Sequence, residues 1–288
     1  MARWDHALPS ADDLPEAIRE YTGSGQFGPA YRIMLEHDTH APGSVDRVGI
    51  EHMIRLCDAT AEFLYSEYTP TTVRHMPGSR PRLEAVCEEI FDGVRDAEKR
   101  VRRIGRFCRR LGAKAPTGPD EEMVFGGTEE QIIDRGSDWC TDVSRVACAL
   151  LQVGGIPSRI VFQANADRPY SGHVIVEAWR SGIWGAVDPT CNVVYRHSSG
   201  RPASVWELMN DDDLLRRHYR NAGTMYTNPQ QFRLSAVVNY RIAHAAGYRY
   251  DMGPLNEYSR RVLEMSLAGW PGGRRWLFGE EQGRCGLQ

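Results

Sequence analysis

The sequence predicts an α+β fold, because the spacing of its apolar residues changes twice along the 288 residues. The spacing is helical over much of residues 45–111, alternates with a period of two over much of residues 158–188, and is helical again after about residue 201. A chain of this length buries a sizeable core without disulfide bonds. We therefore expect central strands that are flanked by helical segments.

Residues 1–118 are expected to form an irregular and then helical region. Residues 1–44 are rich in Pro, Gly, Ser and His, which favours irregular structure. Residues 45–68 carry apolar side chains at helical spacing, and Pro81 opens a second helical segment that runs to about Leu111.

A basic stretch over residues 94–114 has two interpretations. Its many arginines could dock a phosphorylated or acidic partner. Against this, Asp96 and Glu98 each stand four residues before an arginine, and the helix dipole stabilises cations near a helix C-terminus. We favour a solvated helix face and keep docking as the alternative.

Residues 119–200 are expected to form the catalytic core. Thr128 and Gln131 fit a capping box at the start of a short helix. Another helix begins at or beside Cys140, and the glycine pair at 154–155 stops it. The segments that follow with strand-like alternation are 158–164, 173–179 and 183–188.

Residues 201–288 are expected to return to helices that pack on the core. Ser204 and Glu207 fit a second capping box, and residues 229–246 and 254–267 have helical apolar spacing. The three aspartates at 211–213 are not spaced like a calcium loop, which favours a solvated helix face.

Cys140 is the cysteine whose context favours reactivity. A thiol becomes a useful nucleophile when a helix N-terminus and a nearby imidazole lower its pKa. Of the seven cysteines, Cys140 is the one that follows a turn-like segment, residues 136–138, and begins an amphipathic helix. The odd number of cysteines, without a Cys-x-x-Cys pair, suggests neither a disulfide framework nor a zinc site.

Hairpin geometry brings a histidine and an aspartate together. A two-residue turn at residues 181–182 places His173 opposite Thr190, and a four-residue turn places it opposite Asp188. In both registers His173 and Asp188 are direct or diagonal neighbours on one face, within reach for a carboxylate to orient an imidazole, whereas a three-residue turn would separate them.

Four segments together resemble the core of the transglutaminase-like superfamily. They are Gly-Ser-Asp-Trp-Cys-Thr-Asp-Val-Ser-Arg-Val-Ala at 136–147, Gly-Ile-Pro-Ser-Arg at 155–159, His-Val-Ile-Val-Glu-Ala-Trp at 173–179 and Trp-Gly-Ala-Val-Asp-Pro-Thr at 184–190. The resemblance covers roughly residues 125–195. It implies a papain-like fold, in which a helix that opens at Cys140 packs on an antiparallel sheet. It further implies that Cys140 is the nucleophile, His173 the general base and acid, and Asp188 the orienting carboxylate.

The resemblance leaves the oxyanion hole and the substrate groove open. The backbone N–H of Cys140 is a natural oxyanion donor, and Trp139 and Gln131 are candidates for the second donor. Each of these two also fits a simpler role, Gln131 as a helix cap and Trp139 as a packing residue. The walls of an apolar groove could come from Trp139, Trp179 and Trp184, although core packing explains these tryptophans equally well.

The chemistry that the resemblance implies is acyl transfer through a thioester acyl-enzyme. The donor is an amide or thioester, peptide or carrier-bound, and no metal or other cofactor is expected. With an amine acceptor, which we favour, the reaction forms or exchanges an amide as in a transglutaminase. With water the protein is a cysteine peptidase or amidase. A third possibility is a non-catalytic domain that binds peptides.

Composition argues against several classes of partner. The 35 Lys and Arg residues against 38 Asp and Glu leave a net charge of −3, which gives no global field for nucleic acid or an anionic membrane. No run approaches the roughly 18 to 20 continuous apolar residues of a membrane span, and the first residues lack the apolar stretch of a secretion signal. We therefore expect a cytoplasmic protein.

Overall fold

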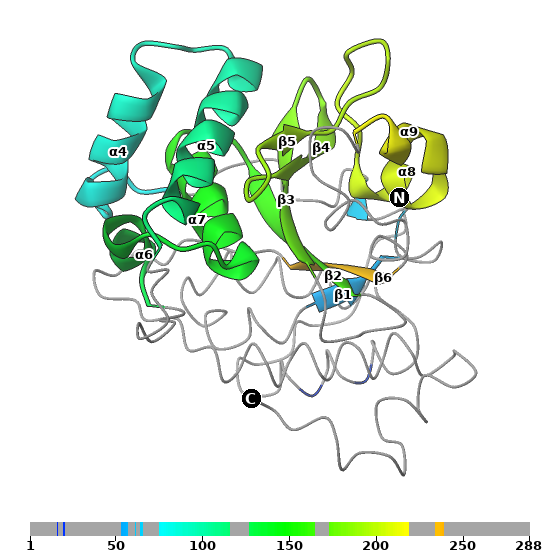
Figure 1. The fold of residues 1–288 in the computed structure, drawn as a ribbon, viewed down its shortest axis with the longest axis horizontal. Coiled ribbons are helices and arrows are strands. Elements are labelled where there is room, and N and C mark those ends of the chain that lie inside the picture. The colour runs from blue at the N-terminus through cyan, green and yellow to red at the C-terminus, as the bar shows by residue number, and fades with distance from the viewer. Residues whose placement is uncertain are drawn as a thin grey trace, which may run out of the picture.

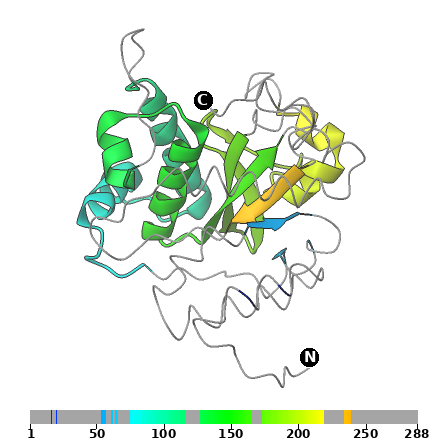
Figure 2. The ribbon, with the colours of Figure 1, turned by 90° about the horizontal axis from the view of Figure 1, so that it is seen from below.

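The computed structural model of the chain describes residues 53–56, 75–115, 127–164, 173–218 and 234–238, together with residues 16, 20, 61, 64 and 65. In these residues a six-stranded antiparallel sheet, in the order β1-β6-β2-β3-β4-β5, has helices on both sides (Figure 1). Helices α4 to α7 lie on one side and α8 and α9 on the other, as the second view also shows (Figure 2). The predicted α+β fold class is confirmed.

The elements follow one another along the chain with these bounds. The helices are α4 (Pro81–Phe91), α5 (Ala97–Gly112), α6 (Glu129–Arg135), α7 (Cys140–Val153), α8 (Val205–Asn210) and α9 (Asp212–Arg216). The strands are β1 (Met53–Arg55), β2 (Ser158–Ala164), β3 (His173–Arg180), β4 (Ile183–Asp188), β5 (Val193–Val194) and β6 (Leu234–Val238).

Two apolar cores lie on the two faces of the sheet. Because side chains alternate along a strand, Val174 and Val176 of β3 pack against α4, α5 and α7, whereas Ile175 packs with residues of α8 and α9. Apart from the half-buried Trp179, every residue of β3 is buried. The first core contains residues of α4 and α5 as well as of α7, so it runs across residue 118. The division of the chain at residues 118 and 200 stays a prediction.

The predicted helical segment from Pro81 to Leu111 is two helices. Asp92 and Gly93 adopt the left-handed region, with φ of 42° and 72°, and end α4. A new helix, α5, then starts at the Asp96 cap, whose side chain accepts a hydrogen bond of 2.8 Å from the backbone N–H of Lys99. The prediction was wrong here because the stop consists of a short Asp-Gly turn, with apolar spacing on both sides of it.

Two segments predicted as helices, residues 45–68 and 229–246, contain strands. Strand β6 lies between β1 and β2, where Val237 pairs with Ile54 on one side and with Val161 on the other. Spacing alone does not separate a short apolar run in a buried strand from a helix turn, and here partners far away along the chain decide the outcome. Residues 254–267 and nearly all of residues 1–44 lie outside the described residues.

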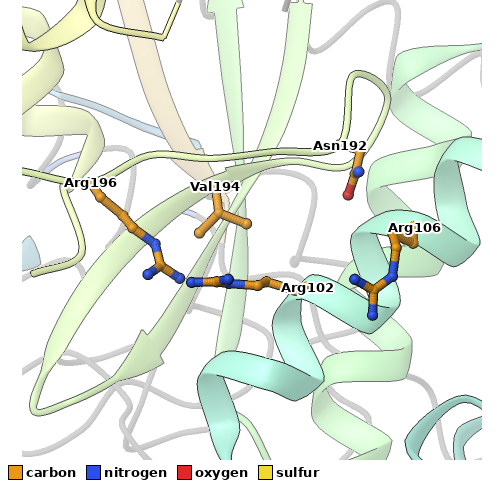
Figure 3. Close-up of a pocket in the computed structure, with 5 residues that line it drawn as sticks. All are labelled: Arg102, Arg106, Asn192, Val194 and Arg196. Atoms are coloured by element: carbon orange, nitrogen blue, oxygen red, sulfur yellow. The ribbon is translucent and has the colours of Figure 1, made fainter. Parts of the chain in front are cut away.

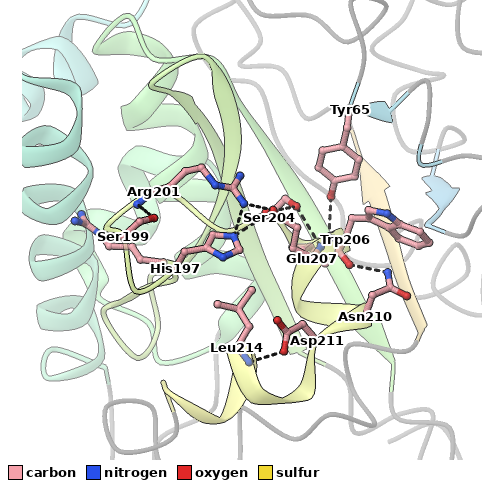
Figure 4. Close-up of polar contacts among 12 residues, drawn as sticks. Tyr65, His197, Ser199, Arg201, Ser204, Trp206, Glu207, Asn210, Asp211 and Leu214 are labelled. Carbon is pink, nitrogen blue, oxygen red and sulfur yellow. Dashed lines mark hydrogen bonds and ion pairs between the residues drawn. The ribbon is translucent and has the colours of Figure 1, made fainter.

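Both predicted capping boxes are confirmed. At α6 the Thr128 side chain accepts from the backbone N–H of Gln131, and the Gln131 side chain accepts from the backbone N–H of Thr128. Ser204 and Glu207 form the same reciprocal pair at α8 (Figure 4). The Asp211 side chain caps α9 by accepting from the N–H of Leu214 at 2.8 Å. The helices in the described part of the chain are all too short or too polar to cross a membrane.

Candidate active site

The β3–β4 hairpin sets the positions of His173 and Asp188. Arg180 pairs with Ile183 across a two-residue turn, in which Ser181 and Gly182 have φ of 55° and 76°. Positive φ at both positions is what a type I′ hairpin turn requires. His173 and Asp188 are therefore diagonal neighbours on one face, and His173 Nε2 lies 2.9 Å from Asp188 Oδ2, with both side chains buried.

The Asp188 carboxylate is held on both of its oxygens. While Oδ2 faces the imidazole, Oδ1 accepts a hydrogen bond of 3.0 Å from the backbone N–H of Cys191. Burial and then the neighbouring Asp188 carboxylate raise the pKa of the Cys191 thiol to about 12. Cys191 therefore supports the carboxylate while its own thiol stays protonated.

Cys140 is the first residue of α7 and is half-buried. Its side chain lies next to the His173 imidazole, whose pKa it helps to raise. Because Asp188 occupies Nε2, Nδ1 is the ring nitrogen available to exchange a proton with the thiol. One turn further along α7, the Ser144 hydroxyl donates to the carbonyl oxygen of Val174 at 2.8 Å, which fixes the start of the helix against the strand of His173.

The His173 imidazole is held in its protonated form. Burial lowers the pKa of His173, but the charge of Asp188, its hydrogen bond and the contact with Cys140 together outweigh burial and raise the pKa to about 10. A positive imidazolium next to the sulfur and the dipole of a helix N-terminus both favour negative charge at this position. The arrangement suits a thiolate nucleophile.

This pKa predicts how stability depends on pH. In the unfolded chain His173 titrates at about 6.5, so the stabilisation of its protonated form is complete below pH 6.5 and is lost as the pH rises to about 10. We expect the difference in unfolding free energy between wild type and His173→Gln, measured by urea titration, to shrink between pH 6 and pH 10. A constant difference would contradict the raised pKa.

A buried charge cluster anchors the N-terminal half of α7. Asp142 accepts from Arg135 at 2.7 Å, and Arg145 binds Glu129 at 3.0 Å. Arg80, from the residue before α4, binds the other oxygen of Glu129 at 2.8 Å. Cations therefore offset the carboxylate of Asp142 in the first turn of α7, and the helix is tied to both α6 and α4.

The arginine of the Gly-Ile-Pro-Ser-Arg segment has a structural role. Arg159 Nε donates to Glu177 at 2.8 Å, and its guanidinium lies between the rings of Tyr65 and Trp184, at 4.7 and 4.2 Å from their centroids. Glu177 also accepts from the Tyr65 hydroxyl and from the backbone N–H of Val205. The cluster joins β2 and β3 to the start of α8 on the side of the sheet away from α7.

The three oxyanion candidates have different surroundings. The Cys140 N–H is at the first position of α7, where a helix provides no acceptor, so it stays a candidate. The Trp139 N–H donates to Ser137 Oγ at 3.2 Å, and the residue is 38% exposed. Gln131 Oε1 accepts from the N–H of Thr128 at 2.9 Å, which holds this side chain in the cap of α6.

Two of the groove candidates lie far from the thiol. Trp179 and Trp184 stack edge to face, with centroids 5.6 Å apart, beside the hairpin turn. His173 is six residues away along β3, roughly 20 Å at about 3.3 Å per residue. Trp184 is 3% exposed and packs on Arg159, so these two tryptophans belong to the packing of the hairpin. Trp139 is the aromatic residue of the three that adjoins Cys140.

Gln163 is a residue near the site that the sequence analysis did not select. It pairs with His173 between β2 and β3 and with Ser235 between β2 and β6, and it is 3% exposed. Within the described residues neither end of its amide has a hydrogen-bond partner. A buried unpaired amide costs about 1–3 kcal/mol, so Gln163 is a candidate for contact with substrate. A single glutamine in an apolar strand was the available signal.

The described residues contain no group of three or more His, Cys, Asp or Glu side chains arranged to hold a metal ion.

These features define an α+β domain in which a cysteine at a helix N-terminus lies next to a buried His–Asp pair. The model of the transglutaminase-like superfamily matches residues 84–189, which include all three of these residues. Residues 84–189 are therefore a transglutaminase-like superfamily domain, as the resemblance predicted. The match also takes in α5 and most of α4. Neither the curated proteins nor the solved structures contain a match to the chain.

Proposed function

We propose that this protein is a cysteine acyltransferase that forms or exchanges amides through a thioester on Cys140. The observation that carries the proposal is the buried His173–Asp188 contact of 2.9 Å, with Cys140 next to the imidazole and contributing to its raised pKa. A nucleophile, a base within reach and a third group that orients the base are the parts that such chemistry needs.

The proposed reaction has two halves. The Cys140 sulfur, its proton transferred to His173, attacks the carbonyl carbon of an amide or thioester, and the Cys140 N–H stabilises the oxyanion. The bond to the leaving amine or thiol then breaks, and the imidazolium supplies its proton. In the second half an amine attacks the thioester, its proton passes to the imidazole, and the released sulfur leaves as thiolate.

An amine is the acceptor that we propose, with water as the alternative. Trp139 directly precedes Cys140 in the chain and is exposed, and the proposal gives its ring the role of shielding a thioester from water on one side. The described cysteines are all free thiols, which suits a reducing compartment, so the proposal places the reaction in the cytoplasm.

Intact-mass analysis tests the proposal. Incubation with amide and thioester donors is expected to add the mass of the acyl group to the wild-type protein, and an added primary amine is expected to remove it as the acyl amide. Release as the free acid at the same rate with and without amine would identify a hydrolase. Absence of any adduct across amide and thioester donors would contradict the proposal and favour a peptide-binding domain.

A further inference from the structure

A pocket lined by arginines lies between α5 and the segment after Asp188 (Figure 3). Its volume is about 220 Å³. Figure 3 shows the guanidinium groups of Arg102 and Arg196 facing each other from opposite sides, with Arg106 further along α5. The lining residues are Arg102, Arg106, Asn192, Val194 and Arg196.

Four of the arginines of α5 divide into two groups. Arg100 and Arg103 donate to backbone carbonyl oxygens, of Gly154 at 2.9 Å and of Phe91 at 2.8 Å, and so hold the helices together. Arg102 and Arg106, four residues apart, lie on another side of the helix and line the pocket. The predicted solvated helix face therefore describes only part of the basic stretch.

The opposite wall of the pocket is fixed next to Asp188. Val193 pairs with Asp188 and Val194 with Val187, so the wall continues directly from the strand of the His–Asp pair. The Asn192 side chain packs on α5 at Gly105, where a Cβ atom would lie 2.7 Å from Asn192 Oδ1. The absence of a side chain at Gly105 is what allows this approach.

The pocket carries excess positive charge. One carboxylate, Glu98, is shared by Arg102 at 3.8 Å, Arg180 at 2.8 Å and Arg196. Burial, opposed by Glu177 and reinforced by Arg102, lowers the pKa of Arg180 to about 10. Arg106 has no acidic partner in the part of the chain that the structure describes, so the three arginines that line the pocket, Arg102, Arg106 and Arg196, have Glu98 as their one ion-pair partner among the described residues.

We propose that this pocket binds a phosphate monoester group of the acyl donor, an assignment that rests on the proposed function. Guanidinium groups present parallel N–H donors that match two phosphate oxygens, and a phosphate brings close to two negative charges. A donor anchored here lies beside the strand end that carries Asp188. An acidic peptide is the competing ligand, and the binding test separates the two.

Direct binding tests the pocket without any need for turnover. Isothermal titration of Cys140→Ser protein with inorganic phosphate, at constant ionic strength, is expected to show binding that Arg106→Gln weakens about tenfold, the worth of roughly one charge-assisted hydrogen bond. Arg95→Gln, which removes the same charge from an exposed position before α5, is expected to leave binding unchanged. Equal weakening by both variants, or equal affinity for phosphate and succinate, would overturn the assignment.

Kinetics with paired thioester donors test the link to the reaction. Removal of a terminal phosphate from the donor is expected to lower kcat/KM about tenfold in wild type, and this preference is expected to disappear in Arg106→Gln. A preference that survives in Arg106→Gln would overturn the donor assignment. If neither donor acylates Cys140, the proposed function fails and takes the donor assignment with it, while the titration still decides whether the pocket binds phosphate.

Discussion

Cys140→Ala protein is expected to lose turnover by a factor on the order of 10⁶, the effect seen when the nucleophile of an acyl-transfer triad is removed. Cys148 and Cys191, two of the cysteines in the described part of the chain, are not expected to replace it, because burial raises the pKa of each thiol to about 12. The residual rate would come from binding and oxyanion stabilisation alone. Steady-state kinetics and intact mass measure this loss, and the acyl adduct disappears with it.

The same substitution at Cys148 is the matched control. Cys148 lies in the same helix, eight residues further on, and its buried thiol contacts the Ser158 hydroxyl at 3.2 Å. Cys148→Ala is expected to retain turnover and the acyl adduct. Circular dichroism spectra of both variants should match wild type, since Cys140 is only half-buried. An adduct that persists in Cys140→Ala would show that another nucleophile carries the reaction.

The parts of the site that follow from local rules could be predicted from the sequence. The pairing of His173 with Asp188 depends on the parity of a short hairpin, so either of the two even-length turns keeps both side chains on one face. The caps at Thr128 and Ser204 depend on residues only three positions apart. In each case the contact and the sequence signal lie within a few residues of each other or within one hairpin.

The parts that depend on distant partners could not be predicted in this way. Strand β6 forms because β1 and β2, from far earlier in the chain, provide its hydrogen-bonding partners. Trp179 and Trp184 are aromatic residues of the kind that line an apolar groove, but they lie beside the hairpin turn and so away from Cys140. The arginine pocket depends on the ion pair between Arg196, which follows β5, and Glu98 of α5. These two residues are far apart in the sequence, and no local pattern predicts their contact.

Asp188→Asn is expected to lower kcat/KM roughly 10⁴-fold, the effect of the same change in other triads. The cause is the tautomer of His173. The backbone N–H of Cys191 needs an acceptor and will take the amide oxygen of the new asparagine, so the amide NH₂ turns toward His173 Nε2. The imidazole then accepts at Nε2 and carries its proton on Nδ1, where it cannot take the proton of the Cys140 thiol.

The pH profile separates this effect from a loss of folding. Asp188 raises the pKa of His173 to about 10 against the lowering effect of burial. Without the Asp188 carboxylate, burial is the larger effect on the His173 pKa and lowers it. The alkaline limb of kcat/KM should therefore move from near pH 10 toward neutral pH. Iodoacetamide alkylation of Cys140 across the same pH range reports the ionisation directly. Asp134→Asn, an exposed carboxylate on α6, is the matched control and should leave both profiles in place. An alkaline limb that stays near pH 10 in Asp188→Asn would mean that another group sets the proton affinity of the imidazole.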